Sequence, residues 1–323
     1  MPNQQVKEAF ELSAKFIAHQ SYQSLTHAFI HFFSSLDNVN EVSSYEIFGS
    51  FSVKNDLSIR RFPLTLSDDF RDNKTDVLLK FLAESKGGIY QDTVNDKHWI
   101  FLDVINGVKP RRAILIEGSL SSQELVTLEG LYGVYANQVA LLDSKERDAL
   151  TQLSNRQTLQ TTLNDIVVYY RNKPDHMKEK SSWLAVLDID HFKKINDDYG
   201  HLFGDEVLVH FSRLMENTFR HTDFIFRYGG EEFVVILNNN NLEGARKSLE
   251  RFRTAVENYD FPSGKVTVSI GFSMIDPVAP PSLHIEYADQ AVYEANNLGR
   301  NKVVYHGDMK AQLGHESNDI EMF

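Results

Sequence analysis

The sequence contains no cysteine. Disulfide bonds, thiolate metal sites and a cysteine nucleophile are therefore excluded. Long apolar runs are missing as well, because no segment approaches the roughly 18 apolar residues that cross a bilayer. Residues 1–20 carry charges and glutamines throughout, unlike the apolar stretch of a signal peptide. These two features predict a cytoplasmic protein.

Positive charge is scarce, with 33 Lys and Arg against 45 Asp and Glu and a formal net charge of -12. This balance argues against a protein that mainly grips a nucleic-acid backbone, because such binding depends on cations that neutralise phosphates. A single basic pocket could still hold a nucleotide. With 42% hydrophobic residues and no biased tract, the 323 residues predict two globular domains.

The first half alternates helical and strand-like patterns. Apolar residues recur at helical intervals over residues 6–33, and a second helix is expected at Asp76–Glu84. Short segments rich in aromatic and branched residues predict strands at Tyr45–Val53, Trp99–Val104 and Ala113–Glu117. This order indicates an α+β domain with an antiparallel sheet over residues 1–147. It resembles the GAF and PAS sensory folds, with GAF favoured by the length and the helix at each end; a module for dimerisation alone is the alternative.

A linker helix is expected at about residues 121–147. Ser121, with Glu124 three residues on, has the form of a capping box. Apolar residues then follow at alternating spacings of three and four: Leu125, Leu128, Tyr132, Tyr135, Val139 and Leu142. This spacing is typical of a coiled-coil seam and equally of an amphipathic helix packed on its own domain. The helix runs directly into the second domain, which favours a dimer seam.

The second half has the pattern of an α/β domain. Helices are expected at Arg156–Tyr170, Gly204–Phe219, Leu242–Tyr259 and Ala288–Asn297, and strands at Trp183–Leu187, Phe224–Tyr228, Phe233–Leu237 and Val266–Phe272. Gly229 and Gly230 join the middle two strands as a hairpin signal. Residues 307–323 are mostly polar and predict a flexible tail.

Carboxylates gather where these strands end. Asp188 and Asp190 follow the strand Trp183–Leu187, and Glu231 and Glu232 follow the diglycine. Magnesium prefers oxygen ligands and takes one or two carboxylates together with substrate phosphates. Two metals held in this way support nucleotidyl transfer. Adjacent strand residues point to opposite faces, so a regular strand would let only one glutamate share the site of Asp188.

The segment Arg227–Phe233, RYGGEEF, resembles the signature of the GGDEF family of diguanylate cyclases in its GGEEF form. Further blocks agree in order and spacing from Asp148 to Tyr305, including DIDHFKKIND at Asp188–Asp197 and the closing Gly299–Asn301. The resemblance implies a palm-like cyclase domain over residues 148–306, with a central, mostly antiparallel sheet surrounded by helices.

The resemblance also implies roles for individual residues. Magnesium or manganese, two ions per site, would be held by Asp188, the carbonyl of Ile189 and Glu231. Glu231, Glu232 and Arg227 would be catalytic. The implied substrate contacts are Asn196 and Asp205 to guanine, Lys193, Arg227 and Arg300 to phosphates, and the backbone of Gly229 and Gly230.

Two further features concern activity and its control. The family commonly has a lysine four residues before the closing arginine, where this sequence has Asn296. Arg220 and Asp223 form an RxxD pair at the distance before the signature where the family has an inhibitory product site, and Arg251 is a further expected contact.

The sequence therefore predicts a diguanylate cyclase that condenses two GTP into cyclic di-GMP and two pyrophosphates. Each half-site would bind one GTP, so a homodimer is expected, controlled by an unknown small-molecule or protein signal at the N-terminal domain. The main alternative is a receptor that binds GTP or cyclic di-GMP without turnover. An adenylate-cyclase-like or polymerase-like enzyme would need other base-reading residues.

Overall fold

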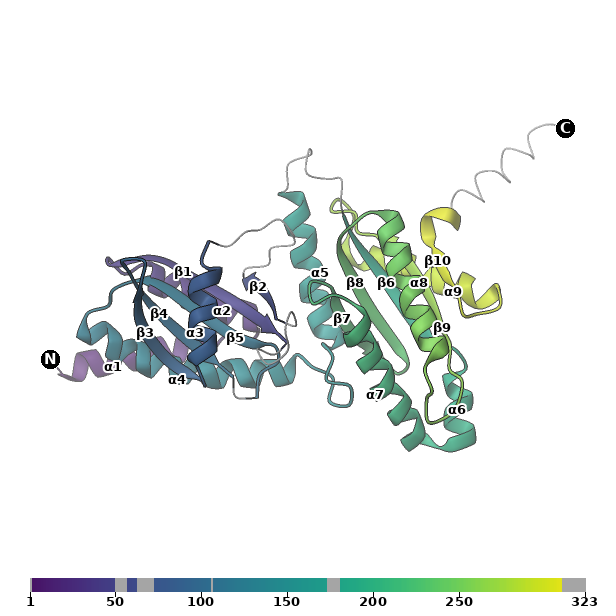
Figure 1. Ribbon diagram of the computed structural model, residues 1–323, viewed down its shortest axis with the longest axis horizontal. Helices are drawn as coiled ribbons and strands as arrows, with labels where there is room; N and C mark the ends of the chain where they lie inside the picture. The colour runs from purple at the N-terminus through teal and green to yellow at the C-terminus, as the bar shows by residue number, and fades with distance from the viewer. Residues whose placement is uncertain (1, 50–56, 63–72, 106, 173–180, 310–323) are drawn as a thin grey trace. The chain divides into compact units, whose positions relative to one another are not determined.

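The computed structural model describes residues 2–49, 57–62, 73–105, 107–172 and 181–309. The chain divides into two compact units, Met1–Glu146 and Arg147–Phe323, each with its own five-stranded sheet (Figure 1). The predicted strand end at Val53 and the tail from residue 310 onward lie outside the described residues. Within the described residues, no helix is long and apolar enough to cross a membrane.

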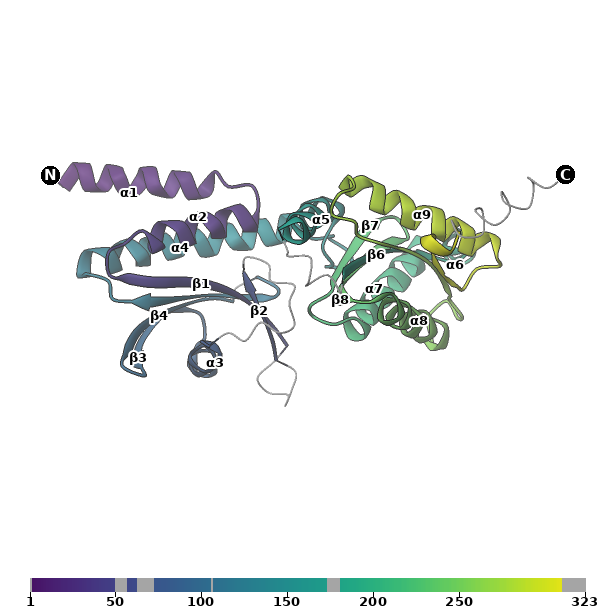
Figure 2. The same cartoon turned by 90° about the horizontal axis from the view of Figure 1, so that it is seen from above.

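The N-terminal unit has an antiparallel sheet in the order β2-β1-β5-β4-β3. The helices α1, α2 and α4 lie on one side of it and α3 on the other (Figure 2). The elements are α1 (Pro2–Ile17), α2 (Tyr22–Ser34), β1 (Val39–Phe48), β2 (Ser58–Phe62), α3 (Thr75–Glu84), β3 (Gly88–Val94), β4 (Lys97–Val104), β5 (Arg111–Gly118) and α4 (Ser122–Lys145).

Burial of a strand on both faces explains which of these strands could be predicted from the sequence. In β4, Ile100 and Leu102 pack toward α2 and α4, while Trp99 and Phe101 pack toward α3. Such a strand is apolar along its whole length and is easily recognised. The edge strand β3 exposes Gln91 and its neighbours and carries no comparable signal, so it was missed.

Helix α4 confirms the capping box but not the dimer seam. Ser121 accepts a hydrogen bond from the backbone N–H of Glu124, and the Glu124 carboxylate accepts one from the backbone N–H of Ser121. Leu128, Tyr135 and Val139 are buried in the core of their own unit. The prediction of an intermolecular seam along these residues is therefore wrong, because the sheet and α2 already cover this face; the alternative of an ordinary amphipathic helix holds.

The C-terminal unit has a sheet in the order β10-β9-β6-β8-β7. Among the strands that the structure describes in this sheet, only β10 pairs in parallel, which confirms the predicted, mostly antiparallel sheet. In Figure 2, α5 and α9 lie on one side of it and α7 and α8 on the other. The elements are α5 (Arg156–Arg171), β6 (Ser181–Ile189), α6 (Phe192–Tyr199), α7 (His201–Thr218), β7 (Phe224–Gly229), β8 (Glu232–Asn240), α8 (Leu242–Asn258), β9 (Val268–Met274), α9 (Pro281–Asn297) and β10 (Val303–Tyr305).

Three elements of the C-terminal unit differ from the sequence-based expectation. Neither the helix α6 nor the strand β10 was expected. The helix α9 begins at Pro281, seven residues before the predicted start at Ala288. Proline at the first helical position is a known start signal that could have revealed this boundary.

The alternation of side chains along β6 determines which of them face the candidate site. Ala185 and Leu187 belong to the core beneath α7 and α8. Because side chains alternate along a strand, Asp188 lies on the opposite face, toward α5 and α9. The helix α9 reaches this face closely because Gly271 of β9 has no side chain; a Cβ there would overlap the backbone of α9 at Ala288 and Val292.

Candidate active site

The candidate active site begins at the end of β6. Asp188 lies opposite Glu232 of β8 and Ser269 of β9 in the strand register. Side chains directly opposite each other in an antiparallel pair lie on the same face. Asp188 and Glu232 therefore both face the layer of α5 and α9.

Glu231 reaches the same site from the turn between β7 and β8. The strand register shifts between Arg227 and Gly229, and Glu231 lies outside both strands. Its negative charge nevertheless acts on Asp188 more strongly than that of Glu232. This distortion of the turn allows the neighbouring residues Glu231 and Glu232 to approach Asp188 together.

The diglycine leaves open space in front of this turn. Gly230 has a φ of +46°, in the left-handed region that favours glycine. A Cβ at Gly229 or Gly230 would meet no atom within 4 Å. A ligand can therefore approach the backbone of this turn closely.

Asp190 has a structural role distinct from that of Asp188. Its buried carboxylate accepts hydrogen bonds from Ser269 Oγ at 2.7 Å, from Thr267 Oγ1 at 2.7 Å and from the backbone N–H of Asn301 at 3.0 Å. These bonds join the end of β6 to the start of β9 and to the closing loop. Asp190 therefore holds the framework of the site together and is separate from the metal-binding set.

The electrostatics of the site fit a bound cation. Burial and the charge of Glu231 raise the pKa of Asp188 to about 6, and burial and Glu232 raise the pKa of Glu231. A cation relieves such repulsion. Among the described residues, no group of three or more His, Cys, Asp or Glu side chains is arranged to hold a metal ion. Magnesium binds one or two carboxylates and completes its shell with phosphate and water, which the pair Asp188 and Glu231 would allow.

The helix α9 contributes two side chains that the sequence analysis did not place here. Asn296 lies near Asp188 and acts to lower its pKa, against the stronger raising effects of burial and Glu231. Asp289 is exposed as a residue, but partial burial of its carboxyl group and the nearby Glu232 raise its pKa to about 6. The two residues are seven positions apart and therefore lie on one helix face, a spacing that is visible in the sequence. The sequence does not show which strand end this face covers.

The guanine-binding residues predicted from the sequence lie on the hairpin of α6 and α7. The Asn196 carbonyl accepts a hydrogen bond of 2.9 Å from Gly200, which closes α6. A Cβ at Gly204 would overlap the Asn196 side-chain oxygen. Gly204 therefore makes room for Asn196 beside the first turn of α7, where Asp205 follows.

We expect Gly204→Ala to weaken GTP binding while leaving the fold intact. The added methyl group would displace the Asn196 side chain and remove a base contact, which corresponds to about a tenfold loss of affinity. Steady-state kinetics should show a higher KM for GTP. Gly130→Ala is a control at a glycine with no atom within 4 Å of its Cβ position. An unchanged KM in Gly204→Ala would contradict the assignment of Asn196.

The predicted phosphate-binding cations differ in their environments. Lys193 and Arg300 are exposed. Arg227 is engaged: Nη1 pairs with Asp148 at 2.9 Å, and Nε and Nη2 donate to the Gly230 carbonyl at 3.2 and 2.9 Å. Arg227 thus shapes the diglycine turn and ties it to the opening segment, and contact with phosphate would require it to leave these partners. The role of Asp148 in this clasp was not anticipated.

The residues of the predicted inhibitory site come together between α7 and α8. The buried Asp223 accepts hydrogen bonds of 3.0 Å from the backbone N–H groups of Arg220 and Asn238. Burial raises its pKa to about 6, against the opposing influence of these bonds and of Arg220 and Arg251. Arg251 Nη2 also donates to the Thr218 carbonyl at 2.7 Å. Asp223 therefore shapes the turn that presents Arg220 near Arg251.

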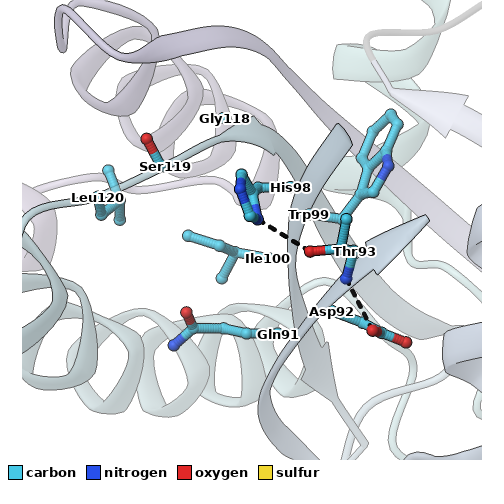
Figure 3. A pocket seen from close by; sticks show the side chains of 9 residues that line it. All are labelled: Gln91, Asp92, Thr93, His98, Trp99, Ile100, Gly118, Ser119 and Leu120. Atoms are coloured by element: carbon cyan, nitrogen blue, oxygen red, sulfur yellow. Dashed lines mark hydrogen bonds between the residues drawn. The ribbon is translucent and has the colours of Figure 1, made fainter. Parts of the chain in front are cut away.

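A separate hollow of about 310 Å³ lies on the N-terminal unit (Figure 3). Residues of β3, of β4 and of the segment after β5 line it, with Thr93 Oγ1 and His98 Nδ1 hydrogen-bonded at 2.9 Å. None of the site residues predicted from the sequence belongs to it. The hollow is therefore unrelated to the carboxylate site.

The family described as "Diguanylate cyclase, GGDEF domain" matches residues 145–302. Diguanylate cyclase DgcP of Pseudomonas aeruginosa is 41% identical over 161 residues, which cover 48% of this chain and 23% of DgcP. Diguanylate cyclase A of Treponema denticola is 38% identical over 182 residues, which cover 54% of this chain and 48% of that protein. The chain thus spans less than half the length of these two relatives.

A solved structure is also similar to this chain. The crystal structure of diguanylate cyclase SiaD in complex with its activator SiaC, from Pseudomonas aeruginosa, is 33% identical in sequence, with a TM-score of 0.51. The match covers 57% of this chain and 71% of that chain.

Proposed function

Because this chain belongs to the GGDEF family of diguanylate cyclases, we propose that it joins two GTP molecules into cyclic di-GMP and releases two pyrophosphates. The observation that carries this proposal is the convergence of Asp188, Glu231 and Glu232 beside an open diglycine turn. Negative charges that repel one another beside an open backbone turn suit a site where cations and phosphates bind together.

The residues of the chain then divide the work. Asp188 and Glu231, with the carbonyl of Ile189, hold the divalent cations, which we expect to be two magnesium ions. When bound, these cations would neutralise the charge that develops at the α-phosphate and favour ionisation of the attacking hydroxyl. Glu231 also accepts the proton of the 3′ hydroxyl, and Glu232 adds negative charge on the same face.

Other side chains position the nucleotide. Asn196 and Asp205 read the guanine edge, because a carboxylate accepts hydrogen bonds from N–H donors that adenine does not offer. The exposed Lys193 and Arg300 meet phosphate oxygens. Arg227 acts on the catalytic turn through its bonds to Asp148 and the Gly230 carbonyl.

Two copies of the chain are required by the product. One site binds one GTP, and each 3′ hydroxyl must attack the α-phosphate of the other nucleotide. The chain therefore acts as a homodimer, in the cytoplasm, where GTP is available. Since Leu128, Tyr135 and Val139 are buried within one unit, the dimer contact uses other surfaces.

The N-terminal unit regulates this activity as a GAF-like sensory domain. A sheet with helices on both faces and a helix at each end supports that assignment. Its last helix, α4, packs on the sheet and ends next to the opening segment that Arg227 clasps. A signal that shifts α4 could act on the catalytic turn through the chain to Asp148 and the Asp148–Arg227 ion pair.

Product inhibition acts through Arg220 and Arg251. A guanidinium binds phosphate and stacks on purines, and Asp223 holds the turn that presents Arg220. We expect Arg220→Ala to raise the concentration of cyclic di-GMP that halves the activity by tenfold or more, without changing the rate in the absence of product. Arg213→Ala, at an exposed arginine of α7, is the control. Equal inhibition of both variants would refute the site.

Pyrophosphate release with GTP and with ATP tests the proposed function. We expect release with GTP and magnesium only, and loss of it in Glu231→Ala. Tight GTP binding without release would instead favour a receptor for GTP or cyclic di-GMP. Release with ATP as fast as with GTP would contradict the roles of Asn196 and Asp205.

A further inference from the structure

The closing loop Gly299–Asn301 has an unusual backbone conformation. The φ angles of Gly299, Arg300 and Asn301 are +104°, +66° and +49°, so three consecutive residues have positive φ. Glycine adopts such angles freely and asparagine tolerates the left-handed region, whereas arginine is strained there. Strain of this kind persists only where the surrounding structure over-determines the conformation. Contacts from outside the loop are therefore needed to hold it.

Asn301 makes these contacts with three of its atoms. Its backbone N–H donates to Asp190 Oδ2 at 3.0 Å. Its side-chain Oδ1 accepts a hydrogen bond of 2.8 Å from Arg253 Nη1, and its Nδ2 donates to Glu257 Oε1 at 2.8 Å. Arg253 and Glu257 both belong to α8. Because an amide has one acceptor end and one donor end, a cation and an anion together fix its orientation.

Arg253 and Glu257, which we call the α8 clamp, are themselves held in place. Arg253 Nη1 pairs with Glu257 Oε2 at 3.0 Å, and Arg253 Nε pairs with Glu250 Oε2 at 2.8 Å. The helix that carries them is anchored in the core of the unit by the buried Phe252 and Val256. Hydrogen bonds between charged groups are among the stronger ones in proteins. The α8 clamp is thus a firm partner for Asn301.

The position of Arg300 depends on this arrangement. Its backbone N–H donates to the Ala295 carbonyl at 3.0 Å, and its side chain is exposed. The loop is thus fixed before Arg300 by the end of α9 and after it by Asn301. A long side chain is presented reproducibly to a ligand only from a backbone that is held in place.

We propose that Arg253 and Glu257 are positioning residues: they hold Asn301, and through it the strained backbone from which Arg300 binds the phosphates of GTP. This inference rests on the proposed function, which gives Arg300 its phosphate contact. Without the α8 clamp the loop relaxes out of the left-handed region, and Arg300 leaves the position from which it meets the phosphates. The loss is therefore expected in the affinity for the nucleotide.

Binding of a GTP analogue measures this role without turnover. An analogue with a methylene group as its α–β bridge is titrated calorimetrically, with magnesium, into the full chain. We expect Arg253→Ala to weaken binding about tenfold, because a charge-assisted hydrogen bond to Asn301 is lost. Asn301→Gly, which keeps positive φ accessible but removes the amide, should weaken it similarly. Glu250→Ala removes an ion pair of the same arginine without touching Asn301, and should bind like the wild type.

A double-mutant cycle with Arg300 separates positioning from a merely structural role. We expect Arg300→Ala to weaken binding about tenfold, and Arg253→Ala to add less than about twofold in that background, because the side chain through which it acts is gone. Equal losses in both backgrounds would overturn the inference in favour of a structural role. Wild-type affinity in Arg253→Ala, with loss in Arg300→Ala, would overturn this inference alone. Wild-type affinity in Arg300→Ala, or no binding by the wild type, would overturn the proposed phosphate contact as well.

Discussion

Asp188→Asn should stabilise the metal-free protein at pH 7.5 and reduce cyclic di-GMP synthesis by at least about 10³-fold, equivalent to roughly 4 kcal/mol. The pKa of Asp188 is raised to about 6 in the folded chain. A raised carboxyl pKa contributes stability below the unfolded value, near 4, which is lost as the pH rises through 6. At pH 7.5 the ionised side chain is therefore destabilising, and asparagine removes that penalty.

The size of the expected stabilisation follows from the pKa shift of Asp188, reduced because solvent screens the partly exposed carboxyl group. Two pKa units correspond to about 3 kcal/mol, and partial exposure of the carboxyl group lowers this to about 1–2 kcal/mol. We expect the melting temperature of the C-terminal unit to rise by about 2–6 °C. Magnesium with a GTP analogue should stabilise the wild type and not the variant.

Asp190→Asn is the matched control two residues away. Its carboxylate accepts three hydrogen bonds from Ser269, Thr267 and Asn301, so this change should lower the melting temperature. A melting temperature of Asp188→Asn below that of the wild type at pH 7.5 would contradict the predicted stabilisation. Full activity of this variant would contradict the role of Asp188 in catalysis.

Gly271→Ala should destabilise the C-terminal unit by about 3 kcal/mol, because overpacking of a close contact costs about 1–3 kcal/mol and sometimes more. The new methyl group would overlap the backbone of α9 at Ala288 and Val292, which cannot move as a side chain can. Displacement of α9 would also move Asn296 away from Asp188. We expect both a lower denaturation midpoint and reduced activity well below the melting temperature.

Gly133→Ala should have the opposite effect on stability. Gly133 lies in α4, and a Cβ there would meet no atom within 4 Å. Alanine should stabilise this helix by roughly 0.5–1 kcal/mol. Urea denaturation of both variants tests the pair, and equal stability of Gly271→Ala and the wild type would show that α9 does not pack as closely as described.

Much of the fold was accessible from the sequence because its signals are local. The capping box at Ser121, the hairpin at Gly229 and Gly230, and the buried strand ending at Asp188 each depend on a few neighbouring residues. The edge strand β3 was missed, since its exposed polar residues resemble a loop. The spacing along α4 could not distinguish a dimer seam from an internal face, because both bury the same stripe.

Some features of the candidate site could likewise be predicted from the sequence, and others could not. The resemblance to the GGDEF signature pointed to Asp188 and Glu231 directly. The different roles of Asp188 and Asp190 depend on partners in β9 and the closing loop, and the clasp of Arg227 on Asp148 joins residues 79 positions apart. The proximity of Asn296 to Asp188 depends on the packing of α9, which no local pattern reveals.

The most direct test of the account is the identity of the product. Purified wild-type chain and Glu231→Ala should be incubated with GTP and magnesium after bound cyclic di-GMP has been stripped, and the nucleotides identified by chromatography and mass. Cyclic di-GMP formed by the wild type and not by the variant is the predicted result. GTP left intact by the wild type, or equal product from both proteins, would contradict it.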